Sequence, residues 1–147
     1  MLTAAPRPAS VGTFVHSVAA PTAASVPLVR RRVRAVLEGW RIAADLADTL
    51  LLAVSELVGN VVRHAAEETG RMDVRLACDR GWLRLEVADG AAALPRLPAG
   101  PADAVTRDAE GGRGLLLVQL LAAEAGGELL VTADEFGKSV RVRVPAA

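Results

Sequence analysis

Several features that would point to particular classes of protein are scarce or missing in this chain of 147 residues. It has a single cysteine, Cys78, which excludes an intramolecular disulfide framework and fits a reducing compartment. No apolar run reaches the roughly 18 residues that a membrane-spanning helix requires. The N-terminus has no basic region leading into an apolar core, so no signal peptide is expected. We therefore expect a cytoplasmic protein without a membrane segment.

An excess of charge of one sign is missing as well. The 17 basic and 17 acidic residues give a formal net charge of zero, so no basic footprint argues for direct nucleic-acid binding. Hydrophobic residues make up 52% of the chain, which is enough for one domain with a substantial core. We expect residues 1–10, rich in Ala and Pro, to be a flexible tail and residues 11–147 to form the domain.

Hydrophobic periodicity predicts helices separated by short strands. The expected strands are 11–19, 72–78, 82–88, 128–133 and 140–144, and the expected helices are 26–40, 43–66 and 115–125. Ser25 is the expected N-cap of the first helix, and Asp79–Gly81 has the composition of a hairpin turn. Apolar and polar residues alternate in the strands, which indicates a sheet with one covered face. The fold class is therefore α+β, a two-layer sandwich.

The segment from Leu50 to His64 carries the first candidate site. Its apolar residues recur at steps of three and four, which is typical of the buried stripe of a helix. Glu56 and Asn60 are four residues apart, so they lie one above the other on a single helix face. A carboxylate can accept a proton, and an amide oxygen can coordinate a hard cation such as Mg²⁺. The alternative is an ordinary solvated polar face.

The segment from Asp89 to Gly112 has no periodicity, and such a long structureless stretch is unusual inside a compact domain. We interpret about 90–112 as a functional lid or a disordered insertion. Asp89 closes an apolar strand just before it. A carboxylate at that position can accept a hydrogen bond from an amino group such as that of adenine, although Asp-Gly is also a common turn.

The expected lid ends in the glycine-rich run Gly111–Gly114, before a helix expected to begin at Leu115. Free backbone N–H groups at a helix start favour an anion, and glycines let a phosphate approach the backbone closely. Arg113 adds a positive charge to this run. Simple loop flexibility is the alternative explanation.

Four motifs taken together give the chain a family resemblance. They are SELVGNVVRHA (55–65), VADG (87–90), EGGRGLLLVQLLA (110–122) and GKSVRVRVP (137–145). In this order and spacing they resemble the GHKL (histidine-kinase-like) ATPase superfamily, over residues 26–145. The resemblance is strongest to the small single-domain anti-sigma-factor serine/threonine kinases and their actinobacterial relatives. It implies helices on a mixed, mostly antiparallel sheet, with ATP between the helical layer and the lid.

The resemblance also implies a role for each motif residue. Glu56 would be the general base, and Asn60 would bind a Mg²⁺ that bridges the phosphates. Asp89, followed by Gly90, would accept a hydrogen bond from the adenine amino group. The phosphate side would be formed by Gly112, Arg113, Gly114 and Leu115, and Ser139 would occupy the place of a family hydroxyl near adenine.

The chain departs from the family pattern at some positions. Ala91 and Ala93 stand where the fuller adenine-side motif has glycines, which leaves weaker ATP binding open. His64 matches a frequent family residue and has no assigned role beyond packing or lid contact. The arginines between Arg30 and Arg34 form either a solvated helix face or a docking patch for an acidic partner.

Two functions fit the resemblance. The first is a protein kinase that moves the γ-phosphate of Mg-ATP to a Ser or Thr of an anti-anti-sigma (STAS-type) partner, with Glu56 deprotonating the hydroxyl. The second is a non-catalytic module that sequesters a sigma factor or another regulator. A homodimer is also suggested by the family. The ATP-binding half of a two-component histidine kinase is less favoured, because no preceding helix carries a phosphoacceptor histidine.

Overall fold

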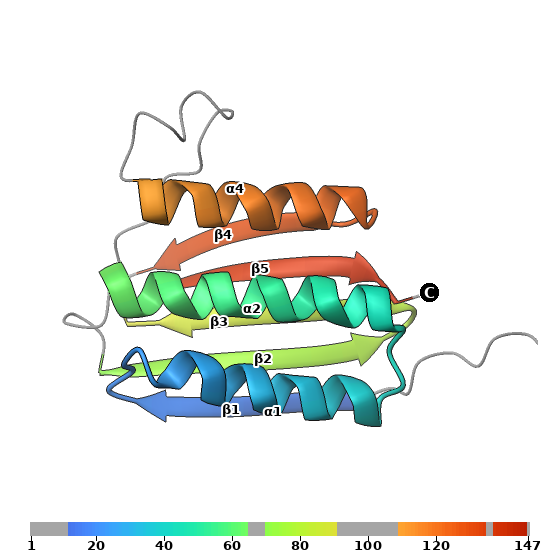
Figure 1. Ribbon diagram of the computed structural model, residues 1–147, viewed down its shortest axis with the longest axis horizontal. Coiled ribbons are helices and arrows are strands. Elements are labelled where there is room, and N and C mark those ends of the chain that lie inside the picture. The colour runs from blue at the N-terminus through green and yellow to red at the C-terminus, as the bar shows by residue number, and fades with distance from the viewer. Residues whose placement is uncertain (1–11, 65–69, 91–108, 135–136, 147) are drawn as a thin grey trace, which may run out of the picture.

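The computed structural model describes residues 12–64, 70–90, 109–134 and 137–146, without the side chains of residues 64, 109–113 and 134. The strands are β1 (Gly12–Ala19), β2 (Arg71–Asp79), β3 (Trp82–Asp89), β4 (Glu128–Asp134) and β5 (Gly137–Pro145). The helices are α1 (Ser25–Gly39), α2 (Ala44–His64) and α4 (Ala109–Glu124). All three helices lie on the same side of one sheet (Figure 1), which confirms the α+β sandwich. The expected tail and most of the expected lid lie outside the described residues.

The strand order is β1-β2-β3-β5-β4, and each neighbouring pair runs antiparallel. The mixed character implied by the resemblance is therefore not found among the described strands. Between β2 and β3, Arg80 and Gly81 have φ angles of 53° and 78°. Two successive positive φ values are typical of the type I′ hairpin turn, so the expected turn at Asp79–Gly81 is confirmed.

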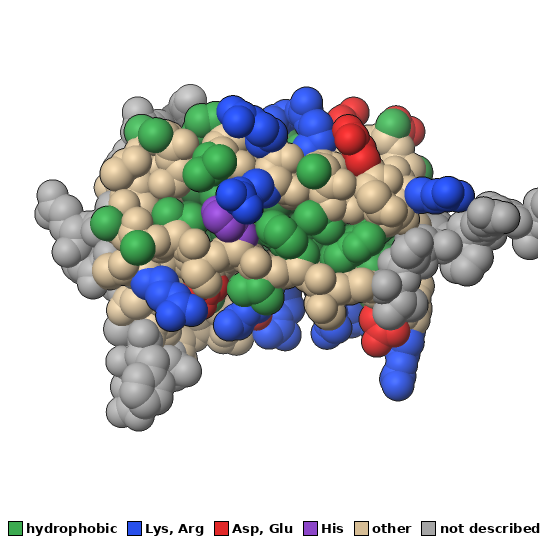
Figure 2. All heavy atoms as spheres, turned by 90° about the horizontal axis from the view of Figure 1, so that it is seen from below, with side chains coloured by type: hydrophobic (Ala, Val, Ile, Leu, Met, Phe, Trp, Pro, Cys, Tyr) green, Lys and Arg blue, Asp and Glu red, His purple; other side chains and the backbone are tan. Residues whose placement is uncertain are grey.

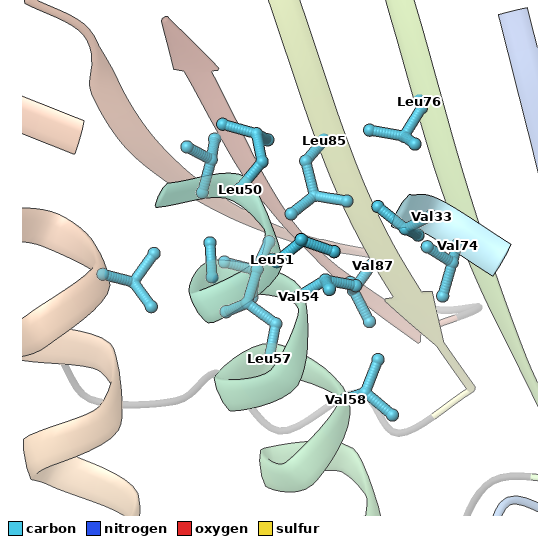
Figure 3. Packing of buried hydrophobic residues seen from close by; sticks show 14 of the residues in the cluster. Val33, Leu50, Leu51, Val54, Leu57, Val58, Val74, Leu76, Leu85 and Val87 are labelled. Atoms are coloured by element: carbon cyan, nitrogen blue, oxygen red, sulfur yellow. The ribbon is translucent and has the colours of Figure 1, made fainter. Parts of the chain in front are cut away.

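Helix α2 provides most of the helical side of the core. The residues of its apolar stripe are at most 3% exposed: Leu50, Leu51, Val54, Leu57, Val58 and Val61. Figure 3 shows side chains of this stripe directed toward those of β2 and β3, such as Val74, Leu85 and Val87. Burial of each such side chain contributes about 1.5–3 kcal/mol, so the rotation of α2 about its axis is strongly fixed. No described helix is long and apolar enough to cross a membrane.

Two helix starts differ from the sequence prediction. Ser25 is the first residue of α1, not its N-cap, and its hydroxyl accepts a hydrogen bond from the N–H of Thr22 at 2.9 Å. Helix α4 begins at Ala109, well before the expected start at Leu115. The glycine-rich run therefore belongs to the first turns of a helix instead of a preceding loop. An apolar run that packs on the core stabilises such a helix despite its glycines.

The arginines of α1 have two different roles. The Arg30 guanidinium donates to the hydroxyl of Ser55 at 2.8 Å and to the carbonyl oxygen of Leu51 at 3.4 Å, which ties α1 to α2. Arg31, Arg32 and Arg34 are exposed. Only these three remain available as a docking patch, so the cluster predicted as one face is divided.

The sheet face opposite the helices is lined by charged residues. Glu86 on β3 accepts hydrogen bonds from Arg75 on β2 at 3.1 Å and from Arg141 on β5 at 2.8 Å. Burial raises the pKa of Glu86, but the hydrogen bonds from Arg141 and Arg75 outweigh it and leave the pKa below its usual value. Beside this ladder, the Arg143 guanidinium lies 3.7 Å from the ring centre of Trp82. A hollow of about 410 Å³ opens there, lined by Asp79, Arg80, Trp82, Arg84, Glu128, Leu130, Arg141 and Arg143.

Strand β1 forms one edge of the sheet and pairs only with β2 in the described part of the chain. Val15 on this strand is 58% exposed. Figure 2 views the molecule from this edge and shows a band of hydrophobic side chains between groups of basic ones. His16 belongs to the same strand, and its ring is stacked on that of Phe14. Its Nε2 atom is buried and has no hydrogen-bond partner among the described residues.

We expect His16 to make the fold less stable in mild acid. Burial, and secondarily the positive charge of Arg32, lower the pKa of His16 in the folded chain. As the pH falls through about 6.5, the unfolded chain binds a proton that the folded chain resists, so the free energy of unfolding decreases. Urea unfolding at pH 7.5 and pH 5.5 measures this change.

The matched variant for this measurement is His16→Phe, which keeps a ring against Phe14 and cannot titrate. The variant should lose less stability than the wild type between the two pH values. Groups other than His16 are the same in both proteins, so their contribution cancels in the comparison. An equal loss in both proteins would show that His16 is not responsible.

Candidate functional site

Helix α2 turns a polar face toward helix α4, and this face carries Glu56 and Asn60. A Cβ atom placed on Gly114 of α4 would lie 2.6 Å from Oε2 of Glu56 and 3.7 Å from Oδ1 of Asn60. A side chain at position 114 would therefore collide with the carboxylate. The structure brings together three residues that the sequence predicted as parts of one site, from segments more than fifty residues apart in the chain.

The two polar side chains of α2 have different surroundings. Both are partly buried beside the apolar stripe. Among the described residues nothing donates a hydrogen bond to the Glu56 carboxylate, so its oxygens are available as proton acceptors. In contrast, Oδ1 of Asn60 accepts a hydrogen bond from Nη2 of Arg63 at 2.8 Å.

Arg63 was not singled out in the sequence. Its side chain folds back along α2, and Nη1 lies 3.1 Å from where a Cβ atom of Gly59 would be. Gly59 therefore leaves room for the guanidinium to reach the amide of Asn60. Any cation that binds this amide oxygen has to replace Arg63. The helical spacing of three residues between Asn60 and Arg63 was the signal that would have predicted the contact.

Asp89 is the last residue of β3, and its side chain is only 1% exposed. It shares the helix-covered face of the sheet with Leu85 and Val87 because side chains alternate along a strand. Its partner in register on β5 is Lys138, whose Nζ atom lies 3.7 Å from Oδ2 of Asp89. The expected carboxylate at the strand end is present, but it faces an ammonium group that the sequence analysis did not assign.

Ser139 lies on the other face of the sheet. It follows Lys138 on β5, is paired with Ala88 and lies beside Glu86. Strand alternation directs its side chain away from the helices and away from Asp89. Ser139 therefore cannot share a surface with Asp89 unless the strand register changes.

The remaining predicted residues lie at the start of α4 and the end of β3. Gly112 and Arg113 fall in the first two turns of α4, and the Arg113 side chain is outside the described residues. Leu115 is 3% exposed and its side chain packs in the core. The free N–H groups of the helix start thus belong to residues 109–112. Gly90 directly follows Asp89.

These groups lie toward one end of the molecule. In Figure 1 the last turns of α2, the first turn of α4, the end of β3 and the start of β5 all lie at the left of the view. Helix contacts connect α2 to α4, and strand pairing connects β3 to β5. This end of the molecule therefore has a proton acceptor, an amide oxygen, an ion pair of a carboxylate and an ammonium group, and a helix N-terminus.

Comparison with known proteins supports the same assignment. The family model described as histidine kinase-like ATPase domain matches residues 19–144. No curated protein matches the chain significantly. Several solved structures share its fold.

The RsbU and RsbW domains of Rv1364c from Mycobacterium tuberculosis match 91% of this chain with a TM-score of 0.65 and 17% identity. The blue-light activated histidine kinase EL346 of Erythrobacter litoralis matches 71% with a TM-score of 0.55 and 26% identity. Each match covers 32% of the other chain, so this chain spans about a third of their length. A chain in the structure of the SiaB–SiaC complex from Pseudomonas aeruginosa also matches, with a TM-score of 0.57 and 17% identity. The match covers 88% of this chain and 88% of that one.

The family match covers most of the domain, including both helices that meet at Gly114 and both strands that meet at Asp89. The chain therefore belongs to the histidine kinase-like ATPase family.

Proposed function

We infer from membership of this family that the chain binds ATP. We propose that it is a cytoplasmic protein kinase of the anti-sigma-factor type, which transfers the γ-phosphoryl group of ATP to a Ser or Thr hydroxyl of a STAS-type anti-anti-sigma partner. The approach of Gly114 to Glu56 and Asn60 is the observation that carries this proposal. The fold shared with a structure that contains an RsbW domain supports it.

In this proposal Glu56 is the general base. Its carboxylate has no hydrogen-bond donor among the described residues, so it can take the proton of the attacking hydroxyl. The oxygen of that hydroxyl then bonds to the γ-phosphorus, and ADP leaves. Most of the remaining catalysis is positioning and neutralisation of charge, as is usual in phosphoryl transfer.

Asn60 is the residue that would hold Mg²⁺. The described residues contain no cluster of three or more His, Cys, Asp or Glu side chains suited to a metal. Mg²⁺ commonly uses one or two protein oxygens together with substrate phosphates and water, so a single amide oxygen beside a carboxylate fits it. When bound, the ion neutralises phosphate charge. Arg63 must then leave the amide of Asn60, and its guanidinium becomes available to a phosphate oxygen.

The other contacts to the nucleotide come from Asp89 and α4. The buried Asp89 carboxylate would accept a hydrogen bond from the adenine amino group. The phosphates would lie at the start of α4, where the free N–H groups of residues 109–112 and the helix dipole favour an anion. Gly114 belongs to the same helix, so its close approach to α2 would hold phosphates bound at the helix start near Glu56.

The alternative is a module that binds a sigma factor or another regulator without catalysis. The hydrogen bond from Arg63 to Asn60 favours this alternative, because it occupies the proposed metal ligand. Ala91 and Ala93 are a further departure from the family pattern, and both lie outside the described residues. The two functions differ in whether phosphate is transferred.

Phosphate transfer from γ-labelled ATP to a purified STAS-domain protein from the same organism tests the proposal. Glu56→Gln keeps the shape of the side chain and removes the base, so we expect the transfer rate to fall about 100-fold or more. The affinity for ATP, measured by calorimetry, should change little in Glu56→Gln and be lost in Asp89→Ala. ATP binding without transfer in the wild type would support the non-catalytic module instead.

Gly114→Ala is expected to separate stability from activity. Alanine favours a helix over glycine by about 1 kcal/mol. The Glu56 carboxylate is the flexible end of a side chain and can move away from the added methyl group. The melting temperature of Gly114→Ala should therefore not fall. The displaced carboxylate should lower the transfer rate roughly 10-fold or more, since misplacement by about 1 Å is costly in catalysis.

Gly39→Ala in α1 is the matched control, because no atom lies within 4 Å of the added Cβ. It should leave the transfer rate unchanged. Full activity in Gly114→Ala would show that contact between α4 and Glu56 is not required.

The edge strand β1 is the surface that we propose for a homodimer. Its sequence, GTFVHSVA, has no proline and no Asp, Glu, Lys or Arg. Sheet edges of proteins that stay monomeric are usually protected by charges, prolines or bulges. A second copy that paired with β1 in the antiparallel sense would extend the sheet and cover Val15.

Val15→Lys places a charge on this edge and should shift the chain from dimer to monomer. The mass of the protein in solution is measured by light scattering coupled to size-exclusion chromatography. A concentration of about 50 µM lies within the range where unpaired strand edges associate. Leu130→Lys on the opposite edge strand β4 is the control, since Leu130 is 50% exposed. A wild-type monomer, or a dimer that persists in Val15→Lys, would contradict the proposed interface.

A further inference from the structure

Lys138 is the only lysine of the chain, and it lies on the covered side of the sheet. Its side chain is 12% exposed, and it shares its face of β5 with the core residues Val140, Val142 and Val144. An ammonium group is costly to bury unless it is paired. Here the partner is Asp89, directly opposite in the register of β3 and β5.

The backbone holds this pair in place. A Cβ atom on Gly137, the residue before Lys138, would collide with the backbone carbonyl oxygen of Asp89. Strand β5 therefore begins in close contact with the end of β3. Because opposing residues of an antiparallel pair project from the same face, the side chains of Lys138 and Asp89 have to lie side by side.

Lys138 and Asp89 are close, but Asp89 does not use all the hydrogen-bond donors of the ammonium group. The distance of 3.7 Å between Nζ and Oδ2 is longer than a hydrogen bond. Among the described residues, Asp89 is the only ion-pair partner of Nζ. An ammonium has three donors, so donors remain that a bound molecule can use.

Side by side, the two groups present an acceptor and a donor. The 6-edge of adenine has the complementary order, with the amino group as donor and N1 as acceptor. We propose that Lys138 is a specificity-determining residue, whose ammonium donates a hydrogen bond to N1 of the purine while Asp89 accepts one from the amino group. This inference rests on the proposed nucleotide site.

The order of the two groups also selects between purines. Guanine has an acceptor at position 6 and a donor at N1, the reverse of adenine. With the ribose in the same place, guanine would set its carbonyl oxygen against Asp89 and its N1–H against Lys138. Two mismatched hydrogen bonds in a buried site are strongly unfavourable, so the pair admits ATP and rejects GTP.

Calorimetric titration with ATP and with 1-deaza-ATP, in which a C–H group replaces N1, tests this contact. Hydrogen bonds to charged groups are the stronger ones, so the wild type should bind 1-deaza-ATP about 10-fold more weakly or worse. Lys138→Met should bind ATP with a similarly reduced affinity and should no longer distinguish the two nucleotides. Arg84→Met removes a positive charge from the other sheet face and should leave both affinities unchanged.

Each other outcome counts against the proposal in a distinct way. Equal binding of ATP and 1-deaza-ATP by the wild type would overturn the contact to N1 while leaving the nucleotide site intact, and this comparison needs no variant to fold. If Lys138→Met weakens ATP but still discriminates against 1-deaza-ATP, the ammonium contacts another part of the nucleotide. Absence of ATP binding by the wild type would overturn the proposed function together with this inference.

Discussion

The structure depends on how α2 is fixed between two neighbours. Its apolar stripe is buried against β2 and β3, which sets the rotation of the helix and directs Glu56 and Asn60 toward α4. The absence of a side chain at Gly114 then allows α4 to approach both of these polar groups. Packing energy is thus used to position groups that contribute little to packing themselves. The same helix is also tied to α1 through Arg30, so both of its flanks are constrained.

Much of the fold could be predicted because the hydrophobic pattern of each strand and helix is contained within a short stretch of sequence. Alternation predicted β2 and β3, the turn between them required two residues with positive φ, and the helical stripe predicted α2. The start of α4 was not predictable from the same rules. Its glycines disfavour a helix locally, and the stabilising contribution comes from the apolar run that follows and packs on the core. Local propensity was overridden by packing that no short window of sequence contains.

The candidate site shows the same division between local and distant information. Glu56 and Asn60 were predicted from their spacing on one helix, and their approach to Gly114 is now visible. The pairing of Lys138 with Asp89 was missed because it follows from strand register, which joins two residues almost fifty positions apart. Ser139 was predicted near adenine, but it is one position away from Lys138 on β5. Lys138 faces the helices, and Ser139 therefore faces the opposite side of the sheet. Arg63 was missed although its spacing from Asn60 was available in the sequence.

The described helices cover only one face of the sheet, and this has a consequence for how such a domain can be connected to others. The proposed nucleotide site uses groups on the covered side, whereas the ladder of Arg75, Glu86 and Arg141 and the hollow beside Trp82 lie on the reverse. Strand β3 contributes Asp89 to one side and Glu86 to the other, only three residues apart. A macromolecule on the reverse side would not cover Asp89, and any bend that it imposed on β3 would also move the Asp89 carboxylate. Because β3 contributes residues to both faces, an occupant of one face could affect an occupant of the other without competing for space.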